Sequence, residues 1–146
     1  MQYSTINYMP AKDQINSSLS TSGFSGPIHV LVVDDLRVNY LLVKAMLGKF
    51  NAHVSFCDSG FKAVEHIKNG SKTDIVLMDF NMPGIDGTET TERIKAIDPS
   101  IPVISLSTFT DSPSFDKNGS VYDGYISKPV NPELLIEEIT RILLNR

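Results

Sequence analysis

From Ile28 onwards, short apolar runs alternate with segments of helical periodicity, and this alternation constrains the fold more than any other feature of the sequence. The run at 28–33 is almost entirely apolar, and the run IVLM at 75–78 is wholly so. Strands of this kind are covered on both faces, as in parallel sheets that lie between two layers of helices. The sequence therefore predicts an α/β protein.

Strand and helix alternate about five times in roughly 120 residues, and connections between parallel strands are right-handed. This count predicts a doubly wound (βα)5 fold of the flavodoxin-like type, with a parallel five-stranded sheet in the order 2-1-3-4-5. We expect strands at 28–33, 53–57, 74–78, 101–106 and 125–127. We expect helices at 37–49, 60–67, 88–97 and 131–145.

The last two helices differ in their sequence signals. Asn131 is a good N-cap for the final helix, and Pro132 suits its first position. The helix expected within 108–120 has weaker support, because this segment holds Pro113 and a turn-forming Asn-Gly pair at 118–119. We predict a short or irregular fourth helix there.

Residues 1–27 differ from the rest of the chain, because they are rich in Ser, Thr and Asn and show no sustained period. Such segments bury too little apolar surface to fold on their own. We therefore predict a flexible N-terminal tail at 1–27 and one folded domain at 28–146. A docking segment built on Tyr3, Tyr8 and Phe24 is the alternative for the tail.

Composition argues against several classes of function. The net charge is −4 and Lys and Arg form no block, so we expect no nucleic-acid partner. Cys57 is the only cysteine, which excludes an intramolecular disulfide and a multi-thiolate zinc site and fits a buried thiol in a reducing compartment. The sequence shows neither an apolar run of membrane-spanning length nor a secretory signal. We therefore expect a cytoplasmic protein without membrane insertion.

Polar residues suited to one kind of chemistry stand at the ends of four expected strands. The first strand runs into Asp34 and Asp35, the third into Asp79, the fourth into Ser107 and the fifth into Lys128. The carboxyl ends of parallel strands share one edge, where open α/β sheets bind ligands. Each residue alone has an ordinary explanation, such as a helix cap, a loop start or a solvated lysine, but their coincidence favours a site.

The residue types at this edge suit phosphoryl transfer. Three neighbouring carboxylates repel one another, and a hard divalent cation with oxygen ligands, Mg²⁺, relieves that repulsion. Lys128 adds a positive charge, and the Ser107 hydroxyl can donate a hydrogen bond to an incoming oxyanion. Phosphoryl transfer depends on such positioning and charge neutralisation. A carboxylate such as Asp79 can act as the nucleophile and form an aspartyl phosphate.

Four motifs resemble those of the receiver domains of response regulators, in the same order and with near-standard spacing. They are VVDD (32–35), VLMDFNMPGIDG (76–87), PVISLS (102–107) and YISKP (125–129). The resemblance extends from about residue 28 to the C-terminus. Asn39, which ends a DDxxxN pattern, is similar to its counterpart in receivers attached to hybrid histidine kinases.

The resemblance implies a role for each residue of the metal site. Asp79 matches the phosphoacceptor, and Asp35 matches the carboxylate that binds Mg²⁺ directly. Asp34 matches the carboxylate that acts on the metal mainly through water, and Asn81 matches the residue whose backbone carbonyl coordinates the metal.

The resemblance also implies which groups respond to the phosphoryl group. Ser107 matches the hydroxyl residue that contacts this group and moves on activation, and Lys128 matches the lysine that pairs with a phosphoryl oxygen. Tyr125 matches the aromatic residue whose inward rotation signals the phosphorylated state, although a half-buried tyrosine of an edge strand is its ordinary alternative. The Lys128–Pro129 bond matches the cis peptide of the family.

The implied function is that of a phosphoacceptor in a His-Asp phosphorelay, not that of an enzyme that turns over a separate substrate. A histidine kinase or a histidine phosphotransfer protein would supply the phosphoryl group, and a downstream protein target would read the result by direct contact. A phosphatase of the haloacid dehalogenase type also forms an aspartyl phosphate, but it would need a second acid where Asn81 stands.

The sequence departs from the family pattern after Ser107. The following segment is about one residue short, Thr108 replaces a usual Ala, and Val121 replaces a usual Gly. These departures affect the surface that receivers commonly use for output. They leave open a pseudo-receiver, an interaction module that works without phosphorylation.

Overall fold

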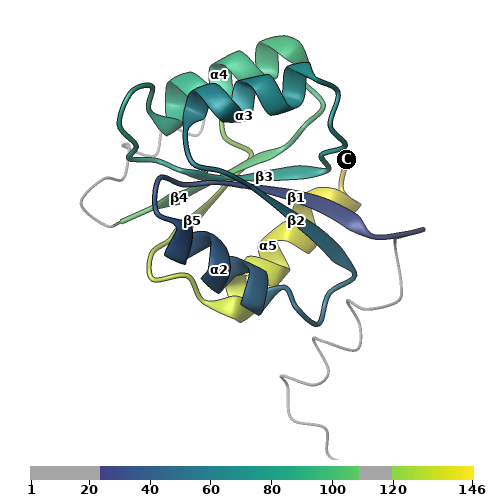
Figure 1. Ribbon diagram of the computed structural model, residues 1–146. Helices are drawn as coiled ribbons and strands as arrows, with labels where there is room; N and C mark the ends of the chain where they lie inside the picture. Colours follow the sequence, from purple (N-terminus) through teal and green to yellow (C-terminus); the bar gives the residue numbers. More distant parts are fainter. Residues whose placement is uncertain (1–23, 109–119) are drawn as a thin grey trace, which may run out of the picture.

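A parallel five-stranded sheet between two pairs of helices makes up the computed structural model, which describes residues 24–108 and 120–146 (Figure 1). The strands are β1 (Ile28–Val33), β2 (Ala52–Cys57), β3 (Ile75–Asp79), β4 (Val103–Ser107) and β5 (Gly124–Ser127). The helices are α2 (Arg37–Met46), α3 (Gly60–Lys68), α4 (Gly87–Ile97) and α5 (Pro132–Leu144). Helices α3 and α4 cover one face of the sheet, and helices α2 and α5 cover the other.

The sheet has the predicted topology. Its order is β2-β1-β3-β4-β5 and every neighbouring pair is parallel, which confirms the doubly wound fold. Strands β3 and β4 are buried at every residue, which explains their continuous apolar sequences. The irregular helix was predicted within 108–120, of which 109–119 lie outside the described residues, as does the tail before residue 24.

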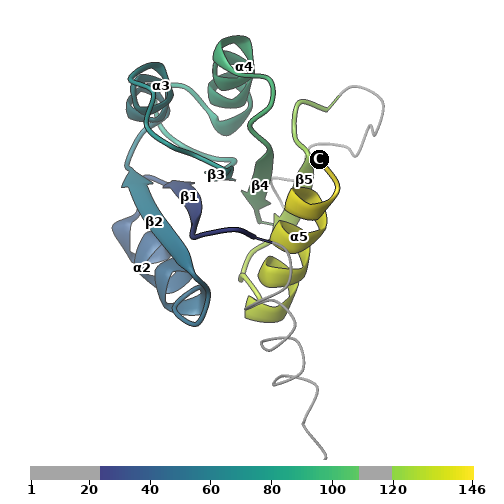
Figure 2. The ribbon, with the colours of Figure 1, turned by 90° about the vertical axis from the view of Figure 1, so that its right-hand side faces the viewer.

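Alternate residues of β1 supply two separate apolar cores, one under each of the two helix layers seen in Figure 2. On one face, Val32 of β1 belongs to a buried cluster with Val43 of α2 and Leu135 of α5. On the other face, the next residue, Val33, belongs to a cluster that reaches Ala63 of α3 and Ile94 of α4. Packing from both sides holds the strand ends, and the side chains that follow them, in fixed positions.

Most element boundaries differ from the prediction by one to three residues, and two of these differences have identifiable reasons. Strand β3 extends to Asp79, because Asp79 pairs with Leu106 and the Phe80 N–H donates to the Leu106 carbonyl at 2.9 Å. Helix α2 ends at Met46, before the predicted end at 49, because the chain turns there and the Gly48 N–H donates to the Ala45 carbonyl at 3.2 Å. The phosphoacceptor candidate is thus part of a strand.

Side-chain hydrogen bonds cap the starts of α3, α4 and α5, whereas α2 has no side-chain cap. The Asn131 carboxamide oxygen accepts from the Glu133 N–H at 2.9 Å, which confirms the predicted N-cap of α5. Helix α4 is capped by Asp86, which accepts from the Glu89 N–H at 2.8 Å. Before α2, the Asp34 carboxylate accepts from the Leu36 N–H at 2.8 Å, so a candidate site residue also turns the chain out of β1.

The described residues just before β1 contact the folded domain. Phe24 is partly buried and packs against the core cluster on the α2–α5 side of the sheet. In the two described ranges, no helix has both the length and the apolar character needed to cross a membrane.

The loop between β3 and α4 returns at Gly87 to its own start at Phe80. The Gly87 N–H donates to the Phe80 carbonyl at 3.1 Å. A Cβ atom at Gly87 would overlap the Asp79 carbonyl oxygen and would lie 3.0 Å from both the Phe80 Cα and the Tyr122 hydroxyl. These neighbours leave no room for a side chain.

Gly87→Ala is therefore expected to lower the free energy of unfolding by about 1–3 kcal/mol, because the end of β3 must move away from α4. Urea denaturation of the two proteins measures the difference. Gly26→Ala is the control, because a Cβ at Gly26 has nothing within 4 Å. Equal stability of the two variants would contradict the close packing at Gly87.

Candidate functional site

Three carboxylates meet at the carboxyl edge of the sheet. Asp34 and Asp35 follow β1, Asp79 ends β3, and each offers an oxygen that lies within 4.8 Å of those of the other two. Asp34 is 0% exposed and Asp79 is 5% exposed, whereas Asp35 lies on the surface. The site is thus open to solvent on the Asp35 side and closed by the protein beneath.

Lys128 brings the positive charge that the sequence predicted at this edge. Its Nζ lies 2.9 Å from Asp79 Oδ1 and 3.5 Å from Asp34 Oδ2, so one ammonium group serves both buried carboxylates. The Lys128 backbone N–H donates to the Ser107 carbonyl at 2.8 Å, which anchors the end of β5 to β4. The Lys128–Pro129 bond is cis, as predicted.

Ser107 and Asn81 frame the site on its other sides. Ser107 ends β4 and is 6% exposed. It follows Leu106, the strand partner of Asp79, so the register places it beside the end of β3. Asn81 lies in the exposed loop after β3, and its backbone N–H bonds to the Asp79 carboxylate. The five strand-end residues predicted from the sequence are therefore gathered at one edge.

The charges at this edge are not balanced. Burial is the largest cause of the raised pKa of Asp79. The hydrogen bond from Lys128 lowers this pKa and the Asp34 charge raises it further, and the net shift is upward. Burial works against the charged form of Lys128, but Asp79 and Asp34 outweigh it and raise the lysine pKa. The lysine thus stays protonated, and the carboxylates retain an excess of negative charge.

The residues present fit a hard divalent cation. Two buried carboxylates and one exposed carboxylate offer oxygen atoms close together, with an open side on which water can complete the coordination. This is the donor set that Mg²⁺ takes in proteins. A cation would also favour the ionised form of Asp79, which burial and, to a lesser extent, the Asp34 charge disfavour.

Asn39 contacts the site, which was not foreseen from its place in the DDxxxN pattern. Its Nδ2 donates to Asp34 Oδ2 at 3.0 Å, from the first turns of α2. One feature of the sequence and one hydrogen bond of the structure account for this contact. Asn39 stands five residues after Asp34, and the Leu36 N–H bond to Asp34 folds the intervening chain into a turn.

Tyr125 lies on β5 with its ring half-buried. Its hydroxyl is hydrogen-bonded to the Ser120 hydroxyl, and its ring meets Tyr122 edge-on with centroids 5.7 Å apart. Tyr122 is buried, and its hydroxyl lies 3.1 Å from Thr88 Oγ1 at the start of α4. Burial raises the pKa of Tyr122. Sequence reasoning did not assign this residue to the core.

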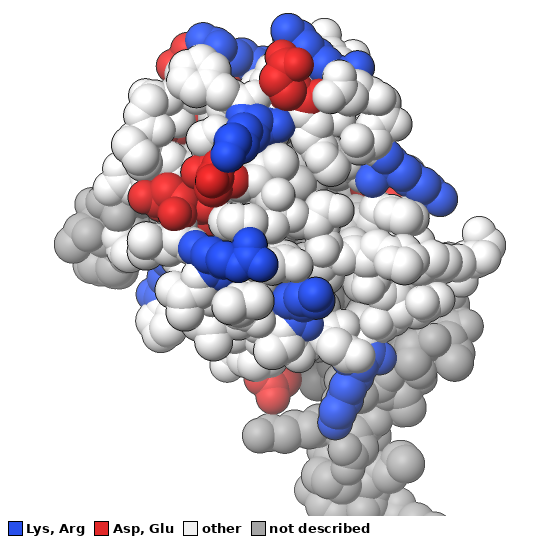
Figure 3. All heavy atoms as spheres, in the orientation of Figure 1, with Lys and Arg blue, Asp and Glu red and all other residues white. Residues whose placement is uncertain are grey.

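One face of the molecule and the single thiol can be compared with the expectations from composition. On the face seen in Figure 3, Lys and Arg side chains are interspersed with Asp and Glu. Cys57 ends β2 with its thiol buried, and this burial raises the thiol pKa. A buried, protonated thiol is a poor nucleophile, as expected for a structural cysteine.

Comparisons with known proteins agree with this geometry. Residues 30–140 match the model of the response regulator receiver domain. The chain is 30% identical over 134 residues to hybrid signal transduction histidine kinase H of Dictyostelium discoideum, covering 88% of this chain and 10% of the kinase. It is 35% identical over 109 residues to signal transduction histidine-protein kinase BarA of Escherichia coli, covering 73% of this chain and 12% of the kinase.

A solved structure gives the same result. Chemotaxis protein CheY4 of Vibrio cholerae is similar with a TM-score of 0.72 and 28% identity, over 81% of this chain and 100% of that one. The chain therefore covers a whole solved receiver, but it spans only about a tenth of the length of the kinases.

Asp79→Asn is expected to raise the midpoint of thermal unfolding of the Mg²⁺-free protein by several degrees at neutral pH, since it removes a buried charge that Lys128 compensates only in part. In a domain of about 150 residues, roughly 1 kcal/mol moves the midpoint by about 2–4 °C. The pKa of Asp79 is higher in the folded protein than its ordinary value of 3.8. The destabilisation is thus full above the folded pKa and is lost as the pH falls through it.

Thermal scans in a chelator, from about pH 7 down to about pH 4, test both the sign and this pH dependence. Asp58→Asn is the control, because the Asp58 side chain is 50% exposed and pairs with Lys62 on the surface. Its midpoint should follow the wild type at each pH. A midpoint for Asp79→Asn at or below that of the wild type at neutral pH would mean that Lys128 fully compensates the buried charge.

Proposed function

This chain belongs to the response regulator receiver family, and from that premise we propose that it is the phosphoacceptor of a His-Asp phosphorelay. In this proposal Asp79 takes the phosphoryl group in a Mg²⁺-dependent reaction. The observation that carries it is the placement of the buried Asp79 carboxylate, 2.9 Å from the Lys128 ammonium and within 4.8 Å of the oxygens of Asp34 and Asp35. Receiver domains are signalling modules and do not turn over a separate substrate.

In the proposed reaction, an Asp79 carboxylate oxygen attacks the phosphorus of a phosphohistidine in line. The bond from phosphorus to the histidine nitrogen breaks as the bond to Asp79 forms. Lys128 pairs with a phosphoryl oxygen, and the Ser107 hydroxyl donates to another. Both groups reach the site from strand ends held by the Lys128 N–H to Ser107 carbonyl bond of 2.8 Å, so little reorganisation is needed.

The carboxylates are assigned to the metal. Asp35, Asp79 and the Asn81 backbone carbonyl would hold Mg²⁺, with Asp34 acting through water, and the ion would neutralise charge on the phosphoryl oxygens. The pKa of Asp79, which burial raises, supports this assignment. A cation stabilises the ionised carboxylate, which is the nucleophilic form.

The phosphorylated state is proposed to be read at Tyr125. A dianion on Asp79 draws Ser107 towards it, and space beside Ser107 then favours an inward position of the Tyr125 ring. In the structure Tyr125 makes a hydrogen bond to Ser120 and an edge contact with the Tyr122 ring. Rotation of the Tyr125 side chain would break these contacts and form others. A downstream protein target would bind this altered surface.

The first experiment is mass spectrometry of the intact protein after incubation with acetyl phosphate, with and without Mg²⁺. We expect a single phosphate adduct that requires Mg²⁺, that is lost in Asp79→Asn, and that is retained in Asp58→Asn, whose carboxylate is exposed. An adduct of unchanged yield in Asp79→Asn would refute the assignment. Failure of the wild type to bind either phosphate or beryllofluoride would favour a pseudo-receiver.

Helix α2 offers a surface for the phosphodonor. We define its outer face by Val38, Leu41, Leu42 and Ala45, which follow helical spacing and are all exposed, the first three at 57%, 49% and 52%. The helix begins two residues after Asp35, so this face adjoins the open side of the site. A histidine that reaches Asp79 brings its protein over the same area. We therefore assign the outer face of α2 to a histidine kinase or a histidine phosphotransfer protein.

Leu41→Glu is expected to lower kcat/KM for transfer from a phosphorylated donor protein about tenfold or more, equivalent to roughly 1.4 kcal/mol. Labelling by acetyl phosphate, which needs no protein contact, should continue. Leu144→Glu is the matched control, because Leu144 is 52% exposed against 49% for Leu41 but lies at the opposite end of the sheet, at the C-terminus of α5. Equal losses in both variants, or none in either, would exclude this docking face.

A further inference from the structure

The buried Asp34 carboxylate is held by three donors from three directions. Its Oδ1 accepts from the Leu36 N–H at 2.8 Å, and its Oδ2 accepts from Asn39 Nδ2 at 3.0 Å and lies 3.5 Å from Lys128 Nζ. A carboxylate that is 0% exposed depends on such partners, because water cannot replace them. The donors therefore decide where this charge points.

The lysine is not a dedicated partner of Asp34. It lies 0.6 Å closer to Asp79, at 2.9 Å against 3.5 Å, and in the proposed reaction it turns to the phosphoryl group on Asp79. Oδ2 then keeps only the Asn39 amide as a side-chain donor among the contacts described. Because the amide is neutral, it orients the carboxylate without reducing the negative charge that attracts a cation.

We propose that Asn39 is a positioning residue for the metal site. Its amide holds the Asp34 carboxylate towards Asp35 and Asp79, so that Mg²⁺ affinity depends on a residue that is not itself a ligand. Second partners of this kind fix the orientation of metal ligands in proteins generally. The inference rests on the proposed function, because that function places Mg²⁺ at these carboxylates.

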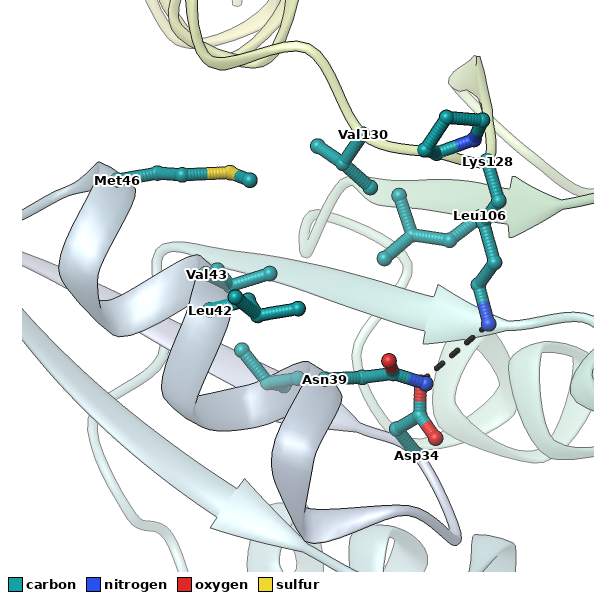
Figure 4. A pocket seen from close by; sticks show the side chains of 10 residues that line it. Asp34, Asn39, Leu42, Val43, Met46, Leu106, Lys128 and Val130 are labelled. Carbon is teal, nitrogen blue, oxygen red and sulfur yellow. Dashed lines mark hydrogen bonds and ion pairs between the residues drawn. The ribbon is translucent and has the colours of Figure 1, made fainter.

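The surroundings of Asn39 allow a clean test. Asn39 lies with Asp34 and Lys128 at the polar end of a cavity of about 240 Å³ between α2 and the chain after β5 (Figure 4). The rest of this cavity is apolar, and its lining includes Leu42, Val43, Met46, Leu106 and Val130. A leucine at position 39 can therefore be accommodated, and a longer amide has space to bend.

The experiment measures Mg²⁺ binding by calorimetry and by the Mg²⁺-induced rise in unfolding midpoint, alongside labelling by acetyl phosphate over a range of Mg²⁺ concentrations. Asn39→Leu, which removes the donor, is expected to raise the Kd for Mg²⁺ about tenfold, at the lower end of the effect of such partners. The labelling rate at saturating Mg²⁺ should recover. Asn39→Gln, which keeps an amide, should restore part of the affinity.

A purely structural role for Asn39 would give a different pattern. It would lower the fraction of folded protein but leave the Kd of that fraction unchanged. Met46→Leu is the control, since Met46 lines the same cavity and has no polar contact to Asp34 to lose. If Asn39→Leu does not fold, Asn39→Ala also lacks the amide and takes its place in the test.

The outcomes separate this inference from the proposed function. A wild type that binds Mg²⁺ and takes phosphate, together with an Asn39→Leu Kd within about twofold of it, overturns the role of Asn39 alone. A wild type that binds no Mg²⁺ overturns both. A raised Kd in Asn39→Leu, with partial recovery in Asn39→Gln and none of the effect in Met46→Leu, supports the inference.

Discussion

Two buried carboxylates that share one ammonium group are the constraint on which the functional edge of this protein depends. Asp34 and Asp79 are both nearly inaccessible to water, and Lys128 lies within 3.5 Å of each. One positive charge cannot balance two buried negative ones, and burial together with the Asp34 charge raises the pKa of Asp79 despite the contact with Lys128. The other polar contacts at this edge orient the charges but leave the excess in place.

The fold supplies this arrangement because a parallel sheet brings residues that are distant in sequence to one edge. Asp34 and Lys128 are 94 residues apart, and only the register of β1, β3, β4 and β5 brings them into contact. Apolar packing on both faces fixes that register. The stability of the site therefore comes from the cores above and below the sheet, and the buried charge of Asp79 opposes it.

Sequence patterns predicted the strand order and the convergence of the strand-end residues, because apolar runs and parallel topology follow general rules. They did not predict which face of α2 is buried. That helix carries apolar residues on both sides, with Tyr40 and Val43 buried and Leu41 and Leu42 exposed. The periodicity of its sequence therefore indicates a helix but does not show which side faces the sheet. The contacts of Asn39 and Tyr122 depend on that kind of tertiary placement and were missed for the same reason.

The excess of negative charge has opposite consequences for folding and for the proposed chemistry. It destabilises the metal-free protein, since burial and the Asp34 charge both disfavour the ionised form of Asp79. The same excess attracts a divalent cation, and a cation that binds only the folded state raises the free energy of unfolding again. A more stable variant with fewer acids would lose the nucleophile or its metal. The apolar cores on both sides of the sheet stabilise the fold enough for the protein to retain unbalanced buried charges at its edge.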